Sequence, residues 1–265
     1  MKKIKPITGF LFLVLTACFL NFSNIWENKS REEWENYLKT SELVRIEKEL
    51  DMGRTDFWKV TLNDGYLQRV AVFKYIDRSR PHLIPDSYKY EIAAYILDKL
   101  LDLNMVPPTI KREIEGQTGS LQLFLSQDEI FSESERIRKN IEPLNPEIFK
   151  HDLIDMGIFE ILTYLDPRQM SDIKIDIKSW HVYRVDFSEA FAPVPDLLKN
   201  REIVGCSKNL YRHMKNLDTD ELEKKLDEYL NQEELQALII RLKLVTEEID
   251  RLIANKGEIS VLFEK

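Results

Sequence analysis

Apolar and polar residues alternate through the first part of the chain, which is the pattern of β-strands. The alternation covers three stretches, residues 43–50, 58–62 and 66–76. Asn63, Asp64 and Gly65 separate the last two stretches, and this sequence is typical of a hairpin turn. We therefore expect three antiparallel strands, preceded by a helix at residues 31–43 with Ser30 as its N-cap.

A helical period replaces the alternation at residues 87–103, where apolar residues recur every three or four positions. Asp86 stands just before this stretch and is the expected N-cap. Two further strand-like stretches follow at residues 109–116 and 120–125. This order of elements predicts a small lobe at residues 43–125, with an antiparallel sheet and one long helix.

The chain becomes more charged and more helical after this lobe. The predicted elements are helices at 126–140 and 146–165, short strands at 172–177 and 181–187, and a mostly helical remainder from 196 to 252. We expect a second, mainly helical lobe that spans residues 126–265. The predicted fold class is therefore α+β with two lobes.

The first residues have a different character. Residues 1–18 combine three lysines with an apolar run that is too short to span a membrane, which is typical of a secretory signal peptide. The run ends in LTAC, which resembles a bacterial lipobox. Cys18 is therefore expected to carry a lipid that anchors the chain to a bacterial envelope membrane, with residues 19–42 as a tether and short helix. The alternative is a chain that keeps its N-terminus and stays in the cytoplasm.

The overall charge argues against one class of function. The chain has 38 Lys and Arg against 46 Asp and Glu, a formal net charge of -8. No basic stripe is present that would neutralise phosphates, so we expect no nucleic-acid partner. The sequence also has no Gly-x-Ser-x-Gly or His-Glu-x-x-His motif that would support hydrolase chemistry.

Lys74 interrupts an apolar strand. Val70, Val72 and Ile76 share its face, and apolar side chains occupy the other face as well. This pattern predicts a strand that is buried on both faces. A buried ammonium needs a charged partner or loses its proton. Glu91, on the helix that follows, is the predicted partner.

Five charged residues follow one another in an order that suits phosphoryl transfer. They are Lys74 on the third strand, Glu91 on the helix, Asp166 on a loop after a long helix, and Asp172 and Asp186 on either side of a short hairpin. In such sites a lysine held by a glutamate contacts the phosphates, and a loop aspartate orients or deprotonates the acceptor. Two further oxygen ligands hold Mg²⁺ or Mn²⁺. The order therefore predicts a nucleotide site for ATP, with a protein, sugar or lipid acceptor left open.

Three stretches of the sequence resemble a group of atypical kinases. They read AVFKYID, SYKYEIAAYILDKLLDLNMVPPTIKREIEGQTGSLQLFL and VYRVDFSEAF. The group includes phosphatidylinositol 3- and 4-kinases, HipA-type kinases and secretory-pathway kinases of the Golgi casein kinase type, with the greatest similarity to bacterial members of the last. The resemblance spans residues 53–191. It implies a two-lobed kinase-like fold in which Lys74 binds ATP and Asp186 binds metal.

The catalytic loop departs from the pattern of this group. The group reads Asp-Arg-His, two residues and then Asn, whereas DPRQMSD matches only if Pro167 is an insertion. Gln169 then stands where His is usual, and Asp172 replaces Asn but still offers an oxygen ligand. Gly53 is the candidate residue for a phosphate lid. The alternative to an active kinase is therefore a catalytically impaired pseudokinase that acts as a membrane-tethered binding or scaffolding lipoprotein.

Overall fold

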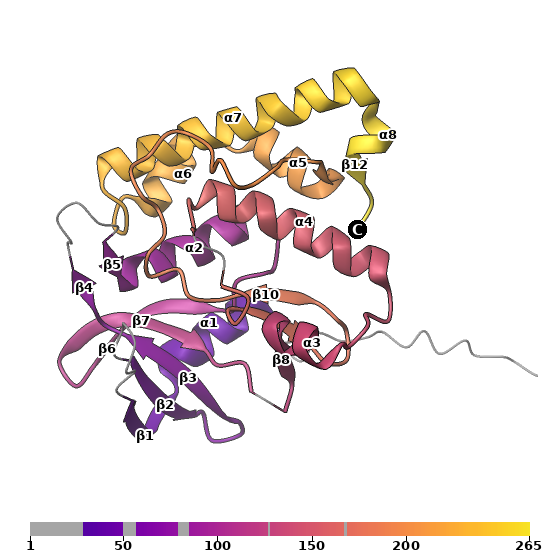
Figure 1. Cartoon of the computed structure of the whole chain (residues 1–265). Coiled ribbons are helices and arrows are strands. Elements are labelled where there is room, and N and C mark those ends of the chain that lie inside the picture. The colour runs from indigo at the N-terminus through magenta and orange to yellow at the C-terminus, as the bar shows by residue number, and fades with distance from the viewer. Residues whose placement is uncertain (1–28, 50–56, 79–84, 127, 167–168) are drawn as a thin grey trace, which may run out of the picture.

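The computed structural model describes residues 29–49, 57–78, 85–126, 128–166 and 169–265. Cys18, Gly53 and Pro167, which were singled out in the sequence, lie outside these ranges. The described chain forms a small lobe built on an antiparallel sheet and a larger, mainly helical lobe (Figure 1). The predicted fold class, α+β with two kinase-like lobes, is confirmed.

Five strands form the sheet of the small lobe. They are β1 (Glu42–Glu49), β2 (Phe57–Asn63), β3 (Gln68–Lys74), β6 (Thr109–Ile114) and β7 (Gln117–Leu123). Their order is β1-β2-β3-β7-β6, and every neighbouring pair is antiparallel. The predicted hairpin turn is present, because Asn63 Oδ1 accepts a hydrogen bond from the Gly65 amide and Asp64 Oδ1 accepts one from the Leu67 amide.

The two faces of β3 are buried to different degrees. Ala71 and Phe73 are fully buried, and the Phe73 ring lies 5.3 Å from that of Trp58 in the core of the small lobe. Val72 and Lys74, on the other face, are only half-buried. The expectation of a strand buried on both faces was therefore wrong. The face that carries Lys74 is thus less completely covered by core side chains than the face that carries Phe73.

Two helices accompany this sheet, α1 (Arg31–Thr40) and α2 (Tyr88–Leu100). α1 has the predicted cap, because Ser30 and Glu33 bond to each other's backbone in a capping box. The cap of α2 is Ser87, whose hydroxyl accepts a hydrogen bond from the Lys89 amide, and not Asp86 as predicted. Asp86 lies one residue further back, where it belongs with Ser87 to the short strand β5 (Asp86–Ser87), which pairs with β4 (Asp77–Arg78).

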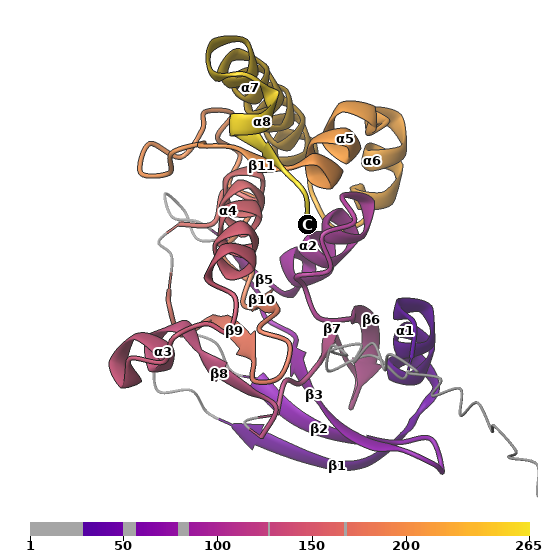
Figure 2. The same ribbon diagram turned by 90° about the vertical axis from the view of Figure 1, so that its right-hand side faces the viewer.

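The two helices lie next to each other at the β6–β7 end of the sheet, since Glu35 of α1 accepts hydrogen bonds from the side chains of Tyr95 and Lys99 on α2. α1 lies against β6 and β7, as Figure 2 shows, while α2 contacts the same two strands and also α6 (Thr219–Leu226) of the large lobe. α2 therefore joins the two lobes. This position matters for function, because α2 carries Glu91.

The remaining elements form the large lobe and its small sheet. The helices are α3 (Glu133–Lys139), α4 (Pro146–Leu162), α5 (Lys208–Asn216), α6 (Thr219–Leu226), α7 (Gln232–Lys256) and α8 (Glu258–Val261). The strands are β8 (Ile130–Ser132), β9 (Ile173–Asp176), β10 (Val182–Arg184), β11 (Cys206–Ser207) and β12 (Leu262–Phe263). β8, β9 and β10 form a three-stranded antiparallel sheet in the order β10-β9-β8.

The prediction of a helix at residues 126–140 was wrong for the first half of this stretch. Residues 130–132 form β8, which pairs with β9, and Ser132 then caps α3. The charged local sequence is compatible with a helix, but residues 130–132 form a strand because they pair with β9, which is distant in the sequence. The long α7 buries an apolar face against α4 and α5 in the core of the large lobe. In the described ranges, no helix is long and apolar enough to cross a membrane.

Candidate functional site

Lys74 lies between two carboxylates that come from distant parts of the chain. Its Nζ is 2.5 Å from Oε1 of Glu91 on α2 and 2.7 Å from Oδ1 of Asp186, just after β10. The side chains of Lys74, Glu91 and Asp186 are 16%, 2% and 49% exposed, respectively. The ion pair predicted between Lys74 and Glu91 is therefore present, and Asp186 joins it from the exposed side.

The three groups set one another's ionisation. Burial disfavours the charge on Lys74, but Asp186 and Glu91 outweigh this effect and raise the pKa of the ammonium above its ordinary value. The charge of Lys74 in turn lowers the pKa of Asp186 to about 2. Burial raises the pKa of Glu91, and Lys74 opposes that rise. The cluster therefore keeps a permanent cation and an ionised, half-exposed Asp186 at neutral pH.

The position of Lys74 depends on a glycine in the neighbouring strand. Lys74 is paired with Ser120 of β7, and Gly119 precedes Ser120. A Cβ on Gly119 would lie only 2.2 Å from the carbonyl oxygen of Lys74 and 2.8 Å from the ring of Phe73. Only glycine therefore allows β7 to approach β3 this closely at the point where Lys74 leaves the sheet.

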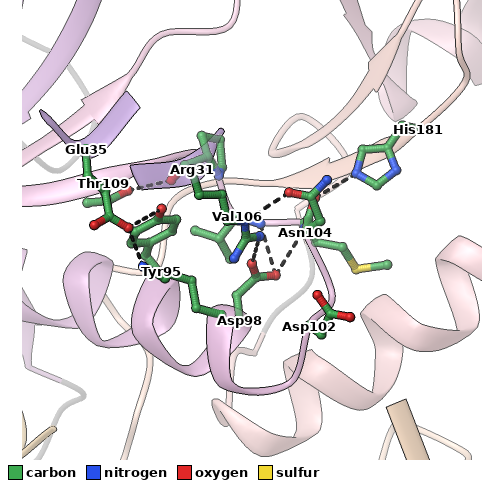
Figure 3. Close-up of polar contacts among 12 residues, drawn as sticks. Arg31, Glu35, Tyr95, Asp98, Asp102, Asn104, Val106, Thr109 and His181 are labelled. Atoms are coloured by element: carbon green, nitrogen blue, oxygen red, sulfur yellow. Dashed lines mark hydrogen bonds and ion pairs between the residues drawn. The ribbon is translucent and has the colours of Figure 1, made fainter. Parts of the chain in front are cut away.

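A buried aspartate fixes the end of α2 (Figure 3). Asp98 is fully buried, and its Oδ1 accepts hydrogen bonds from the backbone amides of Met105 at 2.8 Å and Val106 at 3.2 Å. Arg31 of α1 forms an ion pair with the same carboxylate and donates to Asn104 Oδ1 at 3.1 Å. The turn after α2 is thus held by the helix itself and by α1.

The same turn also contacts the strand that leads to Asp186. The carbonyl oxygen of Met105 accepts a hydrogen bond of 2.9 Å from the backbone amide of Arg184 in β10. His181 Nε2 lies 2.7 Å from the carbonyl oxygen of Asn104, as Figure 3 shows. α2 and β10 are therefore fixed to each other through this turn. This connection helps to bring Glu91 and Asp186 to the same ammonium group of Lys74.

Asp172 lies beside Asp186. Its backbone carbonyl accepts a hydrogen bond of 3.1 Å from the Val185 amide, and its Oδ2 is 3.8 Å from Nη1 of Arg184. Burial raises the pKa of Asp172, Arg184 opposes this rise, and the negative charge of Asp186 adds to it. The two aspartates thus sit close enough to repel each other.

Asp166 belongs to a neighbouring group of charges. It follows α4, and its Oδ1 accepts a hydrogen bond of 2.9 Å from the Asn200 side chain. Nη2 of Arg201 is 3.9 Å from the same oxygen, and the Asp166 side chain is 36% exposed. The structure therefore gathers Lys74, Glu91, Asp186 and Asp172 in one place and leaves Asp166 in contact with residues after β10.

The aspartates offer a donor set for a divalent cation that arrives with phosphates. The part of the chain that the structure describes contains no group of three or more His, Cys, Asp or Glu side chains suited to hold a metal alone. Mg²⁺ is commonly held by one or two carboxylates, with phosphate oxygens and water as its other ligands. Asp172 and Asp186 could supply these carboxylates: burial raises the pKa of Asp172 and the negative charge of Asp186 adds to that rise, so a cation shared by the two would favour the ionised form of Asp172.

Several charged or polar residues near these aspartates were not singled out in the sequence. They are Glu160, Lys174, Arg184, Asn200 and Arg201. Glu160 and Arg184 carry the signal that identified Lys74, a charge inside an apolar run, and this signal applied to them would have found both. Asn200 and Arg201 lie in an irregular segment with no such signal.

Comparison with solved structures places the fold among kinases. The crystal structure of the Helicobacter pylori proinflammatory kinase CtkA is similar over 84% of this chain and 99% of that chain, with a TM-score of 0.54 and 11% sequence identity. The FAT and kinase domain of CtTel1 matches over 82% of this chain and 23% of that chain, with a TM-score of 0.41 and 12% identity. No protein-family model and no curated protein sequence matches this chain. The similarity to CtkA and the two-lobed architecture establish a kinase-like fold.

Proposed function

We propose that this chain is an ATP-dependent phosphotransferase that works with Mg²⁺ or Mn²⁺. The observation that carries the proposal is Lys74, held at 2.5 Å from Glu91 and 2.7 Å from Asp186 in a kinase-like fold. A strand lysine fixed by a helix carboxylate is the arrangement that positions nucleotide phosphates in kinases. The acceptor would be a hydroxyl group of a protein, a sugar or a lipid headgroup.

The two partners of Lys74 would have different roles. Glu91 is 2% exposed and would hold the ammonium whether or not a nucleotide is bound. Asp186 is 49% exposed, so an anionic ligand would approach Lys74 from the Asp186 side. Because Lys74 keeps its proton over the whole physiological pH range, its charge would be available to the phosphates without a coupled protonation step.

The aspartates would supply the rest of the site. Asp172 and Asp186 would hold the divalent cation, which when bound neutralises the phosphate charge that develops during transfer. Asp166, held through Oδ1 by Asn200, would orient the acceptor hydroxyl or take its proton. Gly53, which lies outside the described residues, is proposed from the sequence alone as a nucleotide-binding residue.

We propose that the protein acts at a bacterial envelope membrane. Its support is the sequence alone: a signal-like segment at residues 1–18 that ends in Cys18 within LTAC. Labelling of expressing cells with radioactive palmitate tests this, with the Cys18→Ser variant as control. Label on the wild type alone supports the anchor, and an unlabelled wild-type chain of unchanged length contradicts it.

The nucleotide site is tested by thermal denaturation of the full chain with ATP and either Mg²⁺ or Mn²⁺. A ligand that binds only the folded state at a hundredfold excess over its Kd adds about 2.7 kcal/mol of stability. For a chain of this size that corresponds to a rise in Tm of roughly 5–11 °C. We expect a metal-dependent rise that Lys74→Ala and Asp186→Ala both abolish.

A strand lysine outside the site provides the control. Lys48 of β1 is 56% exposed and pairs with Glu115 at 2.7 Å, so Lys48→Ala should keep the full rise in Tm. The absence of any rise with ATP and either metal, in a wild-type chain that melts cooperatively, would contradict the proposal.

A further inference from the structure

A buried glutamate of α4 connects the two groups of aspartates. Glu160 is fully buried in the large lobe, and each of its carboxylate oxygens faces a different arginine. Oε1 is 3.0 Å from Nε of Arg184, whose side chain is 1% exposed. Oε2 is 3.5 Å from Nε of Arg201, whose side chain is 15% exposed. One carboxylate thus anchors arginines from β10 and from the segment after it.

Each arginine reaches one of the proposed site aspartates with its other end. Nη1 of Arg184 is 3.8 Å from Oδ2 of Asp172. Nη2 of Arg201 is 3.9 Å from Oδ1 of Asp166. The charges therefore alternate in sign along one chain of contacts, Asp172, Arg184, Glu160, Arg201 and Asp166.

Burial makes this chain of contacts rigid. A carboxylate as buried as Glu160 is tolerated only when cations and hydrogen bonds compensate for its lost hydration. Arg184 is fixed further, because Nη1 donates to the carbonyl oxygen of Val185 and the guanidinium lies 5.7 Å from the ring of Phe187. A guanidinium is planar and permanently charged, so fixing one edge also fixes the direction of the other. The position of Glu160 on α4 therefore fixes the direction of Arg184, to which it is hydrogen-bonded, and attracts Arg201 as an ion pair at 3.5 Å.

We propose that Glu160, Arg184 and Arg201 are positioning residues that set the Asp172 and Asp166 carboxylates for phosphoryl transfer. The inference rests on the proposed function and extends it. The buried Glu160 would position the cation-binding Asp172 through Arg184 and the acceptor-binding Asp166 through Arg201. Arg184 holds Asp172 toward Asp186, and Arg201 holds Asp166 together with Asn200. The segment that carries Arg201 is thereby part of the site, although it contributes no group to the phosphates or the cation.

The first test does not depend on activity. Arg201 contacts both Glu160 and Asp166, so a double-mutant cycle of Glu160→Gln and Asp166→Asn measures the coupling of these two carboxylates in the full chain. We expect the drop in Tm of the double variant to be clearly smaller than the sum of the two single drops. Additive drops would overturn the proposal for Arg201 whether or not the protein transfers phosphate.

The second test separates positioning from binding. Arg201→Gln should lower the kcat of ADP formation about tenfold to a hundredfold, the range expected when a reacting group is misplaced, and leave the Kd for ATP within about twofold. Arg201→Lys should recover part of the rate because it restores the charge. The matched control is Arg136→Gln on α3, since Arg136 is 19% exposed, pairs with Glu133 on the same helix and bonds to none of the proposed site residues in the described ranges.

The outcomes of these tests are distinct. An unchanged kcat in Arg201→Gln, or an equal loss in Arg136→Gln, would overturn the positioning role. A wild-type chain that forms no ADP would instead count against the proposed function, and the double-mutant cycle alone would then decide whether the chain of contacts exists.

Discussion

Glu160→Gln gives the sharpest prediction for the stability of this fold. The substitution keeps the size of the side chain but removes the negative charge between Arg184 and Arg201. Glu160 is 0% exposed and Arg184 is 1% exposed, so neither group recovers hydration from solvent. Removing one partner of a buried ion pair typically costs about 3–5 kcal/mol, because the other charge stays buried and uncompensated.

The neighbouring Asp172 places the expected effect at the lower end of that range. Its Oδ2 lies 3.8 Å from Nη1 of Arg184 and compensates part of the buried positive charge that Glu160→Gln leaves without its partner. We therefore expect Glu160→Gln to lower the free energy of unfolding by about 3 kcal/mol. For a chain of this size the corresponding fall in Tm is roughly 6–12 °C.

Urea denaturation and thermal melting of the full chain measure this effect. The control is Glu221→Gln on α6, where the Glu221 and Lys225 side chains are 52% and 47% exposed and lie four residues apart on one helix. A pair of that kind contributes about 1 kcal/mol or less. A loss below about 1 kcal/mol for Glu160→Gln, or one equal to that of the control, would refute the idea that Glu160 compensates two buried cations.

A double variant identifies the cause of the loss. Glu160→Leu with Arg184→Leu removes the buried anion and the most buried cation together. Replacement of a buried ion pair by apolar side chains is often neutral. We expect this double variant to recover more than half of the stability that Glu160→Gln loses. A double variant less stable than Glu160→Gln would show that the pair contributes net stability by itself.

Two further predictions concern Lys74 and its surroundings. Gly119→Ala should lower the free energy of unfolding by about 1–3 kcal/mol and abolish the ATP-dependent rise in Tm, because the new Cβ forces β7 away from the Lys74 carbonyl. Thr118 is exposed, so the control Thr118→Ala should change neither quantity. A Gly119→Ala protein with unchanged stability and an unchanged rise in Tm would contradict the close approach of the two strands. Lys74 lowers the pKa of Asp186 from 3.8 to about 2, so the ionised carboxylate stabilises the fold above pH 3.8 and this contribution is lost as the pH falls through 2. Urea denaturation at a series of pH values measures this contribution. Lys74→Ala should make the free energy of unfolding fall less steeply with decreasing pH in this acid range, by a modest amount because Asp186 is half-exposed. The same dependence of unfolding free energy on pH in wild type and variant would contradict the Lys74–Asp186 pair.

The sequence identified the central pair because a charge inside an apolar run is a strong local signal. Lys74 on an apolar strand and Glu91 on the following helix need each other once both are buried, and the structure pairs them at 2.5 Å. Asp186 was found by the same reasoning, since it ends an apolar strand. The signal acts over short distances along the chain and needs no knowledge of how the lobes meet.

Other features depend on contacts between distant segments. Arg201 follows Glu160 by forty-one positions, and its irregular segment has no periodicity that would show where its side chain points. Residues 130–132 form a strand only because β9 lies beside them. The cap of α2 fell on Ser87 and not on Asp86, since the two candidates are adjacent and the sequence does not distinguish between them.

The most direct test of the central claim is the formation of ADP from ATP by the purified full chain with Mg²⁺ or Mn²⁺, compared with Asp166→Asn. Asp166 contacts neither Lys74 nor Glu91 through any hydrogen bond or ion pair in the described residues, so Asp166→Asn should keep the ATP-dependent rise in Tm. We predict metal-dependent ADP formation by the wild type and its loss in Asp166→Asn. A wild-type chain that binds ATP but forms no ADP, or an Asp166→Asn variant as active as the wild type, would contradict the assignment of this site to phosphoryl transfer.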